Sequence, residues 1–118
     1  MDANQLLEII VKAADDKRAE DIVALDMAGV SLLADYFVVM NGNSERQVQA
    51  IADAVEDAVL LAGGKQPRIE GKKGSRWLLM DFNDIVVHIF VPEERAFYNL
   101  EKLWSDAPLV DVQQWVTE

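Results

Sequence analysis

Residues 77–91 read WLLMDFNDIVVHIFV, and this stretch decides the fold. Two runs rich in β-branched and large apolar residues flank Asn83 and Asp84, a pair that tolerates the positive φ of a two-residue hairpin turn. Phe82 then faces Ile85, and each step outward from the turn pairs the next two residues. One face of this hairpin is wholly apolar and is expected to lie in the core; it carries Leu78, Met80, Phe82, Ile85, Val87 and Ile89.

The opposite face of the hairpin mixes large apolar residues with an acid and a histidine. The same register places Trp77 beside Phe90, Leu79 beside His88 and Asp81 beside Val86. Exposed Trp, Leu and Phe side chains need a cover or a partner. The sequence leaves two alternatives open: a partner protein binds this face, or the C-terminal helix or tail covers it.

Apolar periodicity and turn residues predict the other elements of a mixed α/β (α+β) domain. Ser44 is expected to cap a helix with Gln47 in a capping box, Gly63 to end that helix, and Pro92 to begin the last one. Phe97, Leu100, Leu103 and Trp104 are expected to form the packing edge of this last helix. The expected helices are 2–17, 44–62 and 92–103, the further strands 21–27 and 36–41, the loop 63–76, and 105–118 a tail of uncertain order.

Composition and charge exclude several classes of protein. Without Cys, the chain has no disulfide or Cys-ligated metal site. A net charge of -10 repels phosphate backbones and favours basic partners, although the basic loop from Lys65 to Arg76 leaves room for a minor contact with RNA. The first residues lack the pattern of a signal peptide, and the apolar runs are short for a membrane span, so a cytoplasmic protein is expected.

A catalytic site would need groups that the sequence hardly offers. His88 is the single histidine, no serine lies in a nucleophile-elbow pattern, and no Asp-x-Asp pair falls on an expected strand. We therefore expect neither a metal nor a cofactor. The alternative function is a small nucleotidyltransferase-like enzyme that uses Ser44 at a helix N-terminus, with Asp81 or Asp84 on magnesium.

Four motifs in order carry a resemblance to a known family. They are DIVALDM from Asp21, ADYFVVMNGNSERQVQAIA from Ala34, EGKKGSRWLLMDFNDIVVHIF from Glu70 and ERAFYNLEKLW from Glu94. Over residues 9–104, taken as the domain 1–104, the chain resembles the ribosomal silencing factor family, the Iojap-like or RsfS proteins. It differs in the hairpin turn, where many relatives carry Gly and this chain has Asn83.

The resemblance implies a nucleotidyltransferase-like topology without catalytic acids. It also implies a protein that binds the large ribosomal subunit through its fourteenth ribosomal protein, blocks joining of the small subunit and represses translation during starvation or stationary phase. Free members of the family are often dimers. The resemblance assigns to the partner-facing region Trp77, Asp81, His88, Arg95, Tyr98 and Glu101, and the hairpin register adds Leu79 and Phe90.

Overall fold

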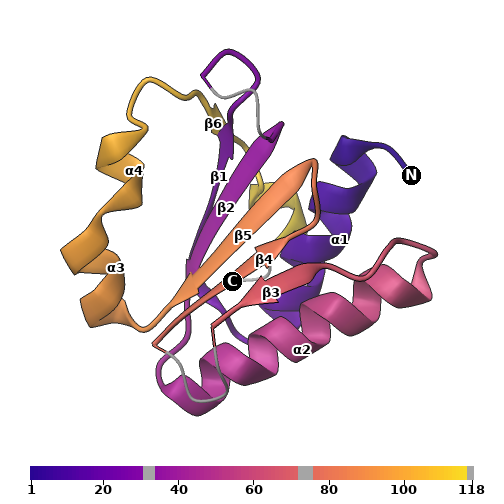
Figure 1. Ribbon diagram of the computed structural model, residues 1–118, viewed down its shortest axis with the longest axis horizontal. Coiled ribbons are helices and arrows are strands. Elements are labelled where there is room, and N and C mark those ends of the chain that lie inside the picture. The colour runs from indigo at the N-terminus through magenta and orange to yellow at the C-terminus, as the bar shows by residue number, and fades with distance from the viewer. Residues whose placement is uncertain (31–33, 72–75, 117–118) are drawn as a thin grey trace.

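The computed structural model describes residues 1–30, 34–71 and 76–116. Within these residues the helices are α1 (Ala3–Asp16), α2 (Glu45–Leu61), α3 (Pro92–Tyr98), α4 (Leu100–Leu103) and the 3₁₀ helix η1 (Gln113–Trp115). The strands are β1 (Glu20–Asp26), β2 (Tyr36–Asn41), β3 (Arg68–Glu70), β4 (Trp77–Asp81), β5 (Ile85–Phe90) and β6 (Leu109–Val110). These strands form one sheet in the order β3-β4-β5-β2-β1-β6, with α1 and α2 on one face and α3 and α4 on the other (Figure 1).

The β4–β5 hairpin has the register that the sequence predicts. Trp77 pairs with Phe90, Leu79 with His88 and Asp81 with Val86, and Asn83 takes the positive φ of +80° that the tight turn requires. The adjacent pair, β5 with β2, is parallel, whereas the other strand pairs are antiparallel. The sheet is therefore mixed, and the predicted α+β class is confirmed.

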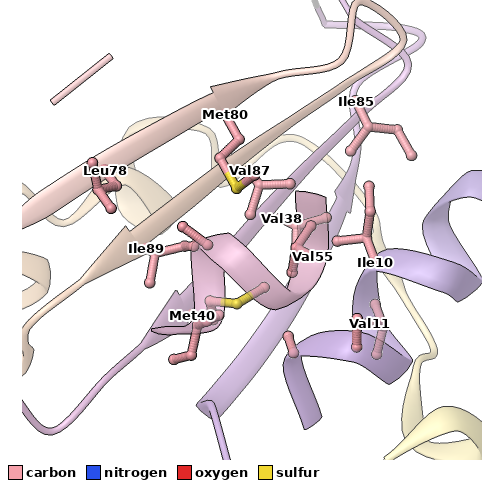
Figure 2. Packing of buried hydrophobic residues seen from close by; sticks show 14 of the residues in the cluster. Ile10, Val11, Val38, Met40, Val55, Leu78, Met80, Ile85, Val87 and Ile89 are labelled. Carbon is pink, nitrogen blue, oxygen red and sulfur yellow. The ribbon is translucent and has the colours of Figure 1, made fainter. Parts of the chain in front are cut away.

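The main hydrophobic core lies between the sheet and the pair α1 and α2. The apolar face of the hairpin supplies Leu78, Met80 and Ile89 to it, and the helices supply Ile10 and Val55 (Figure 2). All five side chains are fully or almost fully buried. The largest buried cluster therefore lies on this face, and the opposite face is covered by shorter elements.

The predicted helix ends are largely correct. Asp2 caps α1 through a capping box with Gln5, and the Ser44 hydroxyl accepts a hydrogen bond from the backbone N–H of Gln47 at 3.1 Å. The Gln47 side chain, however, accepts from the Asn43 N–H, so the reciprocal half of the box predicted at Ser44 is displaced by one residue. Gly63 follows the end of α2 with a φ of +89°, as a glycine in this position commonly does.

Two differences from the predicted elements matter for the functional site. The segment predicted as a loop contains the edge strand β3, which pairs with β4; of that segment, residues 72–75 lie outside the described part of the chain. The last helix is not continuous, because Asn99 adopts a left-handed conformation with φ +46° and ψ +55° and divides it into α3 and α4. This break changes which residues of the segment face the sheet.

Residues 105–116 of the predicted tail pack on the same sheet and core. β6 pairs with β1 at the far edge of the sheet, and Ala107 and Val112 are buried. Trp115, in η1, packs against the main core. In the part of the chain that the structure describes, no helix is both long and apolar enough to cross a membrane.

Candidate functional site

A row of aromatic rings runs from the sheet to the solvent on the face that carries α3. Trp77 stacks on Phe90 with ring centroids 5.0 Å apart, Tyr98 lies 4.6 Å from Trp77, and Phe97 meets Tyr98 edge to face at 5.2 Å. Phe90 is fully buried, Trp77 is half-buried, and Tyr98 and Phe97 are 45% and 79% exposed. We call the three accessible side chains, Trp77, Tyr98 and Phe97, the aromatic surface.

The C-terminal helices cover the rest of this face, so the structure shows the second of the two alternatives for most of it. Leu100 of α4 packs with Val39 and Phe90, and Trp104 contacts Phe37 edge to face at 4.7 Å. Phe90 and His88, both predicted as partner contacts, lie beneath this cover and have almost no exposed area. They support the aromatic surface from below and are not accessible to a partner in this conformation.

His88 is held in a cage of aromatic rings. Its ring has contacts with the rings of Phe37, Trp77, Phe90 and Trp104. Its Nδ1 accepts a hydrogen bond from the indole N–H of Trp77 at 3.2 Å, whereas Nε2 has no hydrogen-bond partner among the described residues. Burial lowers the pKa of His88 from 6.5 to about 4, because the apolar surroundings disfavour the charged imidazolium.

This burial predicts a pH dependence of stability. Because the folded pKa lies below the unfolded one, the unfolded chain binds more protons between pH 6.5 and pH 4, and the free energy of unfolding falls as the pH drops through that window. The expected loss from this one group is at most about 3 kcal/mol. His88→Gln keeps an acceptor for Trp77 without titrating, so urea unfolding of both proteins at pH 7 and pH 5 isolates the effect from that of the carboxylates. Parallel pH profiles for the two proteins would contradict this prediction.

Phe97 was predicted to lie on the packing edge of the last helix, and this prediction is wrong. The break at Asn99 turns α3 relative to α4, so that Leu100 points to the sheet and Phe97 to the solvent. A continuous helical periodicity could not show this break. The sequence signal that was available is Asn99 itself, because Asn adopts the left-handed conformation more readily than most other residues and can end a helix.

Arg95 and Glu101, both predicted to face a partner, bind each other. The Nε–H of Arg95 donates to a carboxylate oxygen of Glu101 at 2.8 Å. Nη1 of Arg95 donates to the carbonyl oxygen of Asp21 at 2.7 Å and to the side-chain oxygen of Asn41 at 3.1 Å. The Arg95 side chain is only 12% exposed, so its donors are directed into the domain.

Leu79 and Asp81 lie along β4 on the same face as Trp77. Leu79 is half-buried opposite His88. Asp81 lies at the far end of the strand, where one carboxylate oxygen accepts from the backbone N–H of Asn83 at 2.8 Å and the other is 3.5 Å from Arg68. The structure therefore brings Trp77, His88, Phe90 and Tyr98 together and places Asp81 apart from them.

The alternative enzyme site does not assemble. Ser44 follows β2 at the end of the sheet where Asn41 pairs with Phe90, whereas Asp84 precedes Ile85 at the opposite end of β5. The two ends of β5, Ile85 and Phe90, are therefore roughly 17 Å apart, at about 3.3 Å per residue along a strand. Ser44 and the two aspartates therefore cannot share a magnesium ion. No group of three or more Asp, Glu or His side chains within the described ranges is placed to hold a metal ion.

Fold and site define a class of small α+β domain, in which one mixed sheet carries two long helices on one face and a short, broken helical segment with exposed aromatic residues on the other. The sequence matches the family described as "Ribosomal silencing factor during starvation" over residues 1–118. The chain belongs to this family, which confirms the resemblance drawn from its four motifs.

Individual relatives agree with this assignment. The chain is 53% identical over 112 residues to "Ribosomal silencing factor RsfS" of Bacillus subtilis, and the match covers 95% of each protein. It is 33% identical over 102 residues to the mouse "Mitochondrial assembly of ribosomal large subunit protein 1", covering 84% of this chain and 45% of that protein. A crystal structure of a Bacillus halodurans protein, 49% identical, superposes with a TM-score of 0.81 over 92% of this chain and 99% of the other.

Proposed function

We propose that this chain silences translation by binding the large ribosomal subunit at its fourteenth ribosomal protein and so blocking association with the small subunit. The observation that carries the proposal is the aromatic surface, because exposed Tyr and Phe beside a half-buried Trp are typical of the centre of a protein interface. The family name supports a silencing role, and the name of the mouse relative refers to the large subunit. A binding protein of this kind turns over no substrate.

Charge supports a basic partner for the aromatic surface. The chain carries 21 acidic and 11 basic residues, and Glu93 and Glu94 precede the aromatic pair in α3. Ribosomal proteins are generally basic, and complementary charge speeds the encounter of two proteins. Arg76 is within 4 Å of Glu45, Glu93 and Glu94, so acids on this chain offset a basic residue at the edge of the surface.

Two finer points of the proposal concern RNA and self-association. A minor contact of the loop from Lys65 to Arg76 with ribosomal RNA stays a prediction, and two arginines of this segment, Arg68 and Arg76, already face acids. We also propose that, in the free protein, the same exposed aromatic residues form the contact between the two copies of a homodimer. The proposed place of action is the cytoplasm, because relatives named as ribosomal silencing factors, such as that of Bacillus subtilis, come from bacteria.

Sedimentation of ribosomal subunits tests the proposal directly. Purified large and small subunits are mixed with the protein at a magnesium concentration that favours association, and the gradient is scored for the protein and for intact ribosomes. We expect the protein to migrate with the large subunit and the peak of intact ribosomes to shrink. Migration with neither subunit, together with an unchanged peak, would overturn the proposal.

A further inference from the structure

One arginine ties together three parts of the chain that are distant in sequence. Arg95 lies in α3, and the acceptors of its side chain are the Asp21 carbonyl at the start of β1, the Asn41 side chain at the end of β2 and the Glu101 carboxylate in α4. Its shortest contacts are 2.7 and 2.8 Å, within the range of charge-assisted hydrogen bonds. These contacts fix α3 to strands β1 and β2 of the sheet and to the following helix, α4.

The acceptors are presented by irregular backbone or by a buried side chain. The β1–β2 register shifts between Glu20 and Val23, and within this bulge Asp21 takes a φ of +50°. Asn41 is buried, so its side-chain oxygen depends on a donor from within the protein. The bulge and the buried amide therefore form an acceptor site that the guanidinium of Arg95 fills.

The other contacts of α3 are few: Arg76 lies 3.4 Å from Glu93 and from Glu94 at the N-terminal end of the helix, and these side chains are partly or largely exposed. The helix has seven residues, none of them buried, and it ends at the left-handed Asn99. Isolated helices this short are not stable in water, so their position depends on tertiary contacts. Apart from the Arg95 contacts, the main support for the C-terminal end of α3 is the packing of Tyr98 on Trp77.

We propose that Arg95 is a positioning residue, which holds α3 so that Phe97 and Tyr98 face the partner, and that it makes no contact with the partner itself. This inference rests on the proposed function, because it assigns how the same surface is presented. An Arg directed at a basic partner would repel it, whereas Arg95 directs its donors inward. Its fork uses Nε and Nη1 on different acceptors at once, a geometry that the single ammonium of Lys cannot reproduce.

Hydrogen exchange of the free protein tests the positioning without any ribosome. Arg95→Ala and Arg95→Lys are compared with wild type and with Arg46→Ala, a control at an exposed position in α2. We expect at least tenfold faster exchange of the amides of α3 and α4 in both Arg95 variants, with α2 and β5 as protected as in wild type. Unchanged exchange in α3 and α4 would overturn the inference, whatever the binding result.

Binding to large subunits then separates positioning from direct contact. We expect both Arg95 variants to bind at least tenfold more weakly, with Arg46→Ala unaffected. In a Phe97→Ser/Tyr98→Ser background, Arg95→Ala should cost little further affinity, because the side chains that Arg95 positions are already missing. A full and additive loss in that background would show that Arg95 touches the partner, and the inference would fail. If the wild type itself does not bind, the proposed function fails, and hydrogen exchange still decides whether Arg95 holds α3.

Discussion

Replacing Phe97 by Ser is expected to weaken binding to the large ribosomal subunit about thirtyfold while leaving the fold intact. A loss of this size corresponds to about 2 kcal/mol, which is typical of an aromatic side chain at the centre of an interface. Phe97 is 79% exposed and packs mainly against Tyr98, so its removal should change the free energy of unfolding by no more than about 0.5 kcal/mol. Co-sedimentation and urea unfolding measure the two quantities.

Leu61→Ser provides a matched control for this prediction. Leu61 is also a large apolar residue, 90% exposed, but it ends α2 on the opposite side of the sheet from α3 (Figure 1). This variant should bind as the wild type does. Equal losses for the two variants would mean that general surface hydrophobicity and not the aromatic surface drives binding, and no loss in Phe97→Ser would remove α3 from the interface.

Trp77 is less suitable for such a test, although the sequence makes it the more conspicuous candidate. It stacks on Phe90, contacts Tyr98 and donates to His88, so its truncation would open a gap and leave Nδ1 of a buried histidine unpaired. A loss of binding in Trp77→Ala would therefore combine the effects of contact and of support. Phe97 separates these effects because it supports almost nothing in the free protein.

The sequence predicts the fold well wherever a local rule governs the structure. The hairpin register follows from the turn at Asn83 and the alternation of side chains along two strands, and the start of α2 follows from the cap at Ser44. β3 was missed because it has three residues and all of them are exposed, so no alternation of apolar residues marks it. It forms because β4 offers an unpaired edge, which is a tertiary cause.

The sequence predicts which face of the sheet carries the candidate site, but it does not predict how deeply each residue of the site is buried. The register correctly places Trp77, His88 and Phe90 on one face, yet it cannot show how much of that face α3 and α4 cover. That coverage depends on the left-handed Asn99 and on Arg95 reaching the bulge at Asp21, a contact across 74 positions of the chain. Sequence periodicity carries no information about such long-range contacts.

The second large effect is expected in the core, where Ile89→Ala should lower the free energy of unfolding by about 2–5 kcal/mol. Ile89 is fully buried in β5, between β4 and β2, and its side chain belongs to the core that α1 and α2 cover (Figure 2). The neighbouring residue Phe90 points to the other face, into a cluster of far fewer buried residues. Truncation at Ile89 thus removes packing from the face that contributes most to stability.

Urea unfolding of Ile89→Ala and of Leu109→Ala measures this difference, since Leu109 is an exposed apolar residue of the edge strand β6. The control should stay within about 0.5 kcal/mol of wild type. A loss below about 1 kcal/mol for Ile89→Ala would mean that the helical face is not the main source of stability. If Ile89→Ala shows the expected loss, the core on the α1–α2 face keeps the domain folded largely without the aromatic surface and its short helices. Arg95 then determines the position of α3 without determining whether the domain folds.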